Sequence, residues 1–135
     1  MSRITDVIIV SPSEGDAMDP LTRLDESRAW YGYFNLVGER LWETSGKSTC
    51  CKVWVGAFNH LERSALLADL AALPWWDPQG VQVLIHDEED SCAGLWMFVG
   101  GDLVEVPLPM RFRSRAPGGL EYGLLQPVPE GPGAD

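Results

Sequence analysis

The stretch Trp54–His86 constrains the fold most, because it shows a strand, a helix, an aromatic turn and a second strand in succession. Side chains alternate between apolar and mixed character along Cys51–Phe58, the period of two that a β-strand has. The alternation returns along Val81–His86, after a turn at Trp75–Gly80. The connection between the two strands is long enough for a right-handed crossover. This unit therefore predicts a sheet with a helix packed on it.

The spacing of two polar residues predicts where that helix begins. Asn59 stands three residues before Glu62, which is the spacing of an N-cap and its reciprocal partner. Leucines recur along one side of the following segment, and Pro74 stops the helix at about Leu73. We expect Asn59 and Glu62 to cap this helix and His60 to be a surface residue of its first turn.

Four further elements are expected outside this unit. The apolar run Val7–Val10 predicts a buried first strand with cover on both faces. A proline at the first helical position and helical spacing of apolar residues predict a helix over Asp19–Tyr31. Strands are expected at Leu95–Val99 and Leu103–Val106, joined by a Gly-Gly turn.

These elements predict an α+β fold. The expected architecture is a two-layer sandwich in which about five mixed or antiparallel strands carry two helices on one face, as a variant of the ferredoxin-like fold. The segment Tyr31–Thr49 has no sustained period. Two alternatives remain for this segment: an extended strand with a loop, or a short helix at Glu39–Glu43.

The chain of 135 residues has the length of one domain. We expect that domain to span residues 1–107. Residues 108–135 contain an arginine cluster followed by a segment rich in proline and glycine, so a mobile C-terminal tail is expected there.

The charge balance argues against nucleic acid as a partner. Ten Lys and Arg face twenty Asp and Glu, for a net charge of -10, whereas phosphate binding needs a basic surface. An acidic surface favours solubility, basic protein partners or mimicry of nucleic-acid charge. Three cysteines without a disulfide framework favour a reducing cytoplasm, and the short apolar run near the N-terminus predicts neither a signal peptide nor a membrane span.

No catalytic motif is complete. Gly46–Thr49 resembles the end of a phosphate-binding loop, but Leu41 stands where that pattern needs a glycine, and a strand follows instead of a helix. His60 and His86 form a zinc site only if they converge with a third ligand such as Cys92. We expect no cofactor and no metal, and the chain is predicted to be non-enzymatic.

Two surface features are the candidate binding residues. Adjacent Trp75 and Trp76 at a turn are difficult to bury together, and an exposed tryptophan is a frequent interface anchor. The acidic run after His86 is interpreted as a solvated loop, since neighbouring side chains point apart. The full candidate set comprises aromatic, imidazole and carboxylate side chains: Trp75, Trp76, His60, His86, Asp87, Glu88, Glu89 and Asp90.

The motifs WVGAFNHL, LPWWDP and VQVLIHDEED, with the leucine-rich segment between the first two, resemble small uncharacterised proteins of actinobacteria and their phages. The resemblance covers about Lys47–Val99. It implies a cytoplasmic or phage-expressed origin and no catalytic residues.

The first functional hypothesis is a non-enzymatic, acidic interaction protein, an adaptor or inhibitor that binds another protein through the Trp75–Trp76 turn and the Asp87–Asp90 loop. The alternatives are a small-ligand binder or metal-assisted enzyme that uses His60 and His86, and an inhibitor that mimics nucleic acid. A homodimer is also expected, because an unpaired edge strand or the tryptophan turn offers a self-complementary patch.

Overall fold

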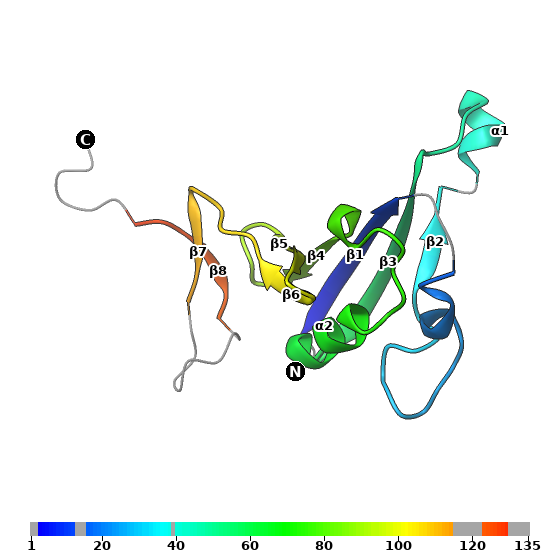
Figure 1. Cartoon of the computed structure of the whole chain (residues 1–135). Helices are drawn as coiled ribbons and strands as arrows, with labels where there is room; N and C mark the ends of the chain where they lie inside the picture. Colours follow the sequence, from blue (N-terminus) through cyan, green and yellow to red (C-terminus); the bar gives the residue numbers. More distant parts are fainter. Residues whose placement is uncertain (1–2, 13–15, 39, 115–122, 130–135) are drawn as a thin grey trace.

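The computed structural model describes residues 3–12, 16–38, 40–114 and 123–129, and the chain is α+β, as the sequence predicts (Figure 1). Six strands form an antiparallel sheet in the order β2-β3-β1-β4-β5-β6, so the expected number of about five is one too low. The strands of this sheet are β1 (Ile4–Pro12), β2 (Asn35–Val37), β3 (Cys51–Asn59), β4 (Gln82–Asp87), β5 (Gly94–Val99) and β6 (Asp102–Glu105). The helical elements are η1 (Asp19–Thr22), α1 (Leu41–Ser45), α2 (Arg63–Ala71) and η2 (Pro78–Gly80).

β1 lies at the centre of the sheet and pairs antiparallel with both β3 and β4. Val7 and Ile9 are fully buried on the face toward α2, which we call the inner face. Ile8 and Val10 point to the opposite, outer face and are only half-buried. The predicted strand is therefore confirmed, but the expectation that it is covered on both faces is wrong for the described residues.

The connections place parallel strands on either side of a third strand. β3 and β4 are both antiparallel to β1, so α2 joins two parallel strands that have β1 between them. In the same way, β1 and β2 are parallel and have β3 between them. The strands β4, β5 and β6 then form the expected meander, with Gly100 and Gly101 at positive φ in its last turn.

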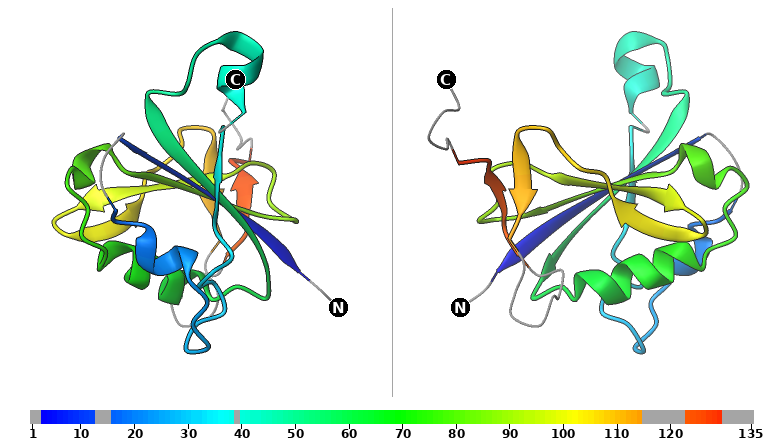
Figure 2. Two further views of the ribbon diagram at one scale, coloured as in Figure 1. Left: turned by 90° about the vertical axis from the view of Figure 1, so that its right-hand side faces the viewer. Right: turned by 60° about the vertical axis from the view of Figure 1, so that its left-hand side comes forward.

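The hydrophobic core lies between the inner face and α2. Figure 2 shows α2 and η1 on the same side of the sheet. Leu66 and Leu70 of α2 and Leu21 of η1 are fully buried there. They pack with inner-face residues into one cluster, whose sheet members include Val7, Ile9, Val83, Ile85 and Trp96. Each such aliphatic side chain contributes about 1.5–3 kcal/mol of burial free energy.

The predicted capping of α2 is wrong. Pairing with β1 extends β3 to Asn59, whose side-chain oxygen accepts a hydrogen bond from the Arg3 N–H at 2.9 Å. The helix begins only at Arg63, with Glu62 at the N-cap position and no side-chain capping bond. Strand pairing occupies Asn59, so the two polar residues cannot act as a capping pair.

The predicted helix over Asp19–Tyr31 is also wrong, because only η1 forms there. Leu24 is 77% exposed, so the segment after η1 offers the core no apolar side chain before Trp30. The Asp25 carboxylate accepts the Ser27 N–H at 2.9 Å, a local turn that competes with helix formation. The inner face therefore carries one α-helix and a short 3-10 helix instead of two helices.

The segment that sequence patterns leave open forms β2 and α1. α1 is short, contributes no buried residue and leaves Trp42 exposed. It stands at the end of β3 opposite to Asn59, and it projects away from the sheet (Figure 1). Among the described helices, none is long and apolar enough to cross a membrane.

Two strands, β7 (Arg111–Arg113) and β8 (Leu125–Pro127), lie in the stretch where we expected a mobile tail. They pair antiparallel as a separate two-stranded sheet. The rest of the expected tail, 115–122 and 130–135, lies outside the described residues.

Candidate functional site

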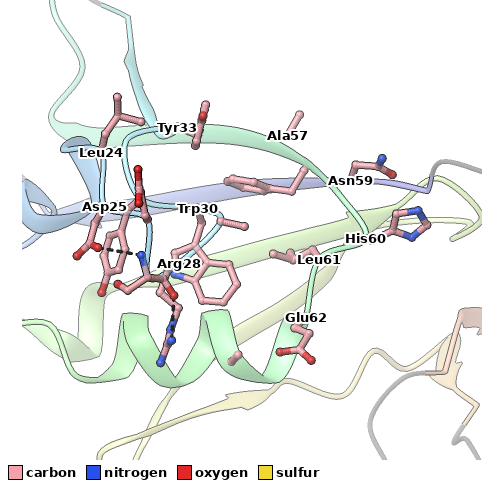
Figure 3. A pocket seen from close by; sticks show the side chains of 16 residues that line it. Leu24, Asp25, Arg28, Trp30, Tyr33, Ala57, Asn59, His60, Leu61 and Glu62 are labelled. Atoms are coloured by element: carbon pink, nitrogen blue, oxygen red, sulfur yellow. Dashed lines mark hydrogen bonds between the residues drawn. The ribbon is translucent and has the colours of Figure 1, made fainter.

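A cleft of about 1080 Å³ lies between the loop after η1 and the junction of β3 with α2. Figure 3 shows Leu24 and Asp25 at one end, His60 and Glu62 at the other, and Trp30 between them. The cleft is open to solvent and includes one residue of the predicted candidate set, His60. It is larger than a second hollow of about 340 Å³ beside β6 and β7.

The end of β3 positions one wall. After Asn59 the chain turns at His60, whose φ of 55° lies in the left-handed region, and the His60 N–H donates to the Arg3 carbonyl at 3.1 Å. The Glu62 side chain makes no capping bond. The polar residues that we expected to act as a helix cap and its first turn line this end of the cleft instead, with the His60 ring at its outer margin (Figure 3).

Hydrogen bonds to α2 position the other wall. The Trp30 indole N–H donates to the Asp69 carboxylate at 2.9 Å, and Arg28 pairs with the same carboxylate at 3.2 Å. Trp30 is buried, whereas Tyr33 beside it is exposed. Because Asp69 anchors both Arg28 and Trp30, the loop holds a defined shape against the helix.

The charge that remains in the cleft is negative. Asp25, Glu26 and Glu62 contribute carboxylates, and the charge of Arg28 is offset by Asp69. The Ser27 backbone N–H lowers the pKa of Asp25, so this carboxyl stays ionised at neutral pH. Within the described residues, neither Glu26 nor Glu62 takes part in an ion pair.

Aromatic side chains form much of the remaining lining. Tyr31 and Tyr33 of the loop are accessible to solvent, whereas Trp30 and Phe58 of β3 are buried beneath the cleft surface. Aromatic faces beside carboxylates attract cations, because the ring quadrupole and the negative charge act in the same direction. The cleft can therefore bind a positively charged group that also carries apolar carbon.

The two histidines do not meet in one site. His86 lies opposite Asp6 on the outer face, and its Nε2 is 3.0 Å from the backbone oxygen of Asp90. His60 is separated from it by β1, and only His60 lines the cleft. In residues 3–12, 16–38, 40–114 and 123–129, no three His, Cys, Asp or Glu side chains are grouped as a metal site.

Two carboxylates of the acidic run are buried, which differs from the solvated loop that we expected. Asp87 accepts a hydrogen bond from the Thr5 hydroxyl. It also pairs with Arg3 at 3.4 Å and with Arg63 at 3.7 Å. Because the inner-face side of β4 carries Asp87, these bonds are part of the interior of the fold.

Asp90 binds the second sheet. Its carboxylate accepts the Leu125 N–H at 2.6 Å and the Asp87 N–H at 3.1 Å, and it lies 3.8 Å from the Arg113 guanidinium. Glu88 and Glu89 between them are exposed, although the Glu88 carboxylate accepts the Ile4 N–H at 3.0 Å. The acidic run thus divides into two structural carboxylates and two that solvent reaches.

Two arginines enclose Trp96, which is 1% exposed. The guanidinium carbons of Arg63 and Arg113 lie 5.4 and 5.2 Å from its ring centroid. Burial lowers the pKa of Arg63. Burial also acts to lower the pKa of Arg113, but the hydrogen bonds to Glu105 and the negative charges of Glu105, Asp90 and Asp87 together raise it. Both stay charged, so the cluster holds β7 on the sheet.

The tryptophan turn lies far from the acidic run. Trp76 is 82% exposed, whereas the Trp75 indole N–H donates to the Leu70 carbonyl at 2.7 Å. The turn precedes β4 and the acidic run follows it, so about 20 Å of strand separates them. The structure does not bring these two parts of the predicted contact surface together.

Sequence patterns missed the loop wall of the cleft. Tyr31 and Tyr33 stand in the segment without a regular period, and Asp25, Glu26 and Trp30 lie within the predicted helix over Asp19–Tyr31. The available signal was the density of aromatic residues directly after an acidic segment. Periodicity cannot detect such a site, because its residues are brought together by a loop that folds over α2.

Comparisons with known proteins gave no match: no family model, no curated protein and no solved structure is similar to the chain. Function is therefore inferred from the geometry of the chain itself.

Proposed function

We propose that the protein is a non-enzymatic interaction protein whose cleft binds a basic segment of another protein. The observation that carries this proposal is the combination of unpaired carboxylates and aromatic rings in one open cleft. The net charge of -10 acts in the same direction, because it attracts a basic partner from a distance. Cytoplasmic location and the actinobacterial or phage origin belong to the same proposal.

The size of the cleft favours a peptide segment over a small molecule. At about 1080 Å³ it slightly exceeds the range of about 300–1,000 Å³ that drug-sized ligands occupy. Asp25 and Glu62 lie toward its two ends, with Trp30 between them (Figure 3). This arrangement suits two basic side chains separated by two or three apolar residues that lie near Trp30.

Exposed residues of the predicted candidate set are proposed as secondary contacts. Trp76 offers a large apolar surface, and Glu88 and Glu89 offer negative charge. They lie at opposite ends of β4, so one small partner cannot contact both. The alternative ligand is a small amine, which would bind near His60 through the same carboxylates and aromatic rings.

A relation to the ferredoxin-like fold is also proposed. The order β4-β1-β3-β2, with a helix between β3 and β4, supports it. On this proposal η1 and the following loop replace the first helix of the two-layer sandwich, and β5 and β6 extend the sheet. That replacement creates the loop wall of the cleft.

Peptide titration tests the proposal. A blocked peptide with two lysines separated by two or three apolar residues should quench tryptophan fluorescence and bind more weakly as salt rises. The same peptide with both lysines acetylated keeps its length but loses its charges, and it should not bind. Free alkylamine in place of the peptide tests the small-molecule alternative.

Variants locate the binding site. Glu26→Gln and Glu62→Gln should each raise the Kd by about two- to fivefold, and Tyr33→Ala by about three- to tenfold. Glu43→Gln on α1 removes an equal charge at the other end of β3 and should leave the Kd unchanged. Equal binding of the acetylated peptide, or a loss of affinity only in Glu88→Gln and Glu89→Gln, contradicts the cleft assignment.

A further inference from the structure

The centre of the outer face of the six-stranded sheet is mostly apolar. The cross-strand register arranges its side chains in two rows, which we call the outer-face rows. One row contains Val55, Ile8, Leu84 and Leu95. The second row contains Val37, Val53, Val10, Gln82, Met97 and Val104. Two polar side chains belong to them: Asn35 of β2, opposite Val55, ends the first row, and Gln82 interrupts the second.

This face has no helical cover in the part of the chain that the structure describes. α2 lies on the inner face, and α1 projects from the end of the sheet (Figures 1 and 2). Ile8 and Leu84 at the centre are half-buried, and Val37 and Val104 at the edges are 42% and 45% exposed. A continuous apolar surface of this kind on a monomer usually marks an interaction site.

The strand sequences themselves are typical of strands covered on both faces. Val7–Val10 is apolar at every position, and so are Val83–Ile85 and Leu95–Val99. A strand with one solvated face normally alternates apolar and polar residues instead. The central strands of the sheet are therefore built for a second apolar layer.

The distribution of charge indicates which kind of molecule can cover the outer face. The chain has a net charge of -10, yet neither outer-face row contains a charged residue. Asp6 and Asp102 stand on the same face beside the rows. A charged partner finds no complementary group within the rows, whereas a second copy presents the same neutral rows and repeats them by two-fold symmetry.

The area also fits a second copy. The six strands have three to nine residues each, so at about 3.3 Å per residue and a spacing of about 4.8 Å they give a footprint of about 600 Å². A standard interface buries about 600–1,000 Å² per partner, so the sheet face reaches the lower end of that range. Sheets that pack face to face at about 10 Å, as in β-sandwiches, provide the geometry.

We propose that two copies of the chain pack outer face to outer face, so that the two α2 helices lie on the outside of a four-layer dimer. The interface is independent of the proposed function, because no residue of the outer-face rows lines the cleft. It also differs from an edge-strand or tryptophan-turn dimer, since neither Trp76 nor the free edges of β2 and β6 are needed.

Sedimentation of the full chain over a range of protein concentrations tests this proposal. The wild type should sediment as a dimer at micromolar concentration, and its Tm should rise with protein concentration. Leu84→Lys at the centre and Met97→Lys on β5 should each raise the dimer Kd at least 100-fold, because each buries an unpaired charge in both copies. Circular dichroism of the two variants checks that the monomer remains folded.

Trp76→Ala and Glu62→Gln are the matched controls, and both should keep the dimer. A wild type that stays monomeric at every concentration overturns the proposal, and so does a dimer that Trp76→Ala dissociates and Met97→Lys does not. If Leu84→Lys fails to fold, Met97→Lys decides, because its strand lies nearer the sheet edge. A higher peptide Kd in Glu62→Gln together with an intact dimer supports both proposals separately.

Discussion

At the scale of single residues, His60 is the position where the backbone departs most from what its side chain prefers. Its φ of 55° lies in the left-handed region, which a residue with a Cβ adopts at a cost of about 1–2 kcal/mol. The turn is imposed by its surroundings, since β3 stays paired through Asn59 and the His60 N–H bonds to Arg3. Strain at an exposed residue in a cleft is consistent with a functional role for its side chain.

Replacing His60 with two small residues separates backbone strain from side-chain function. His60→Gly should have a free energy of unfolding about 1 kcal/mol higher than His60→Ala, because only glycine adopts this φ without strain. Chemical denaturation measures the difference. The same pair of substitutions at Asn59, which lies in a strand, should show the opposite order. An alanine variant as stable as the glycine variant contradicts the strain.

At the scale of elements, the attachment of β7 to the sheet depends on close packing over Gly94. A Cβ at this position would lie 2.6 Å from the Arg113 Nη2 and the Glu105 Oε2, and 2.8 Å from the Trp96 ring. The Arg113–Glu105 pair, at 2.8 Å, occupies the space that a side chain on Gly94 would need. The absence of a side chain at Gly94 thus leaves room for the buried Arg113, which attaches β7 to the sheet.

Gly94→Ala should therefore lower the free energy of unfolding by about 1–3 kcal/mol, the usual cost of overpacking. Thermal and denaturant unfolding measure it, and fluorescence of the buried Trp96 reports on the displaced arginine. In a Glu105→Ala background the same substitution should cost at least about 1 kcal/mol less, because the space is then free. Additive effects of the two substitutions contradict this account.

Sequence patterns predicted the elements unequally. β1, β3, β4, β5 and β6 were visible because period two and apolar runs are properties of the strand itself. The Gly-Gly turn was visible for the same reason. The cap at Asn59 and the helix after Asp19 were wrong, because in both places a tertiary contact or its absence overrode a local preference. The strand pair β7–β8 has no local signal, since a buried arginine bound to Asp90 holds it.

At the scale of the whole molecule, the acidic surface and the apolar outer face predict opposite responses to salt. Binding of a basic peptide in the cleft depends on carboxylate charges, which salt screens. Association through the outer-face rows opposes repulsion between two chains that each carry a charge of -10, and salt screens that repulsion. The two proposed interactions are thus separable in one experiment.

A roughly tenfold increase in sodium chloride, from about 50 to about 500 mM, should raise the Kd of the peptide and lower the Kd of the dimer, each by several-fold. Fluorescence titration gives the first value, and sedimentation gives the second. Met97→Lys should abolish the salt dependence of dimer formation and should leave the salt dependence of the peptide Kd unchanged. Two interactions that weaken together with salt exclude an apolar dimer interface.

The sequence by itself determined the α+β class, the central strands and the leucine-rich helix, because alternation and helical spacing act within one segment. Only the tertiary structure decided which carboxylates are free. Asp87 and Asp90 are adjacent in sequence to Glu88 and Glu89, yet arginines from other elements bury the first two and not the others. The stretch Trp54–His86 supplies about half of the residues that line the cleft, and a loop roughly 30 residues earlier in the sequence supplies the rest. Contacts between distant segments make that site, and no local pattern encodes them.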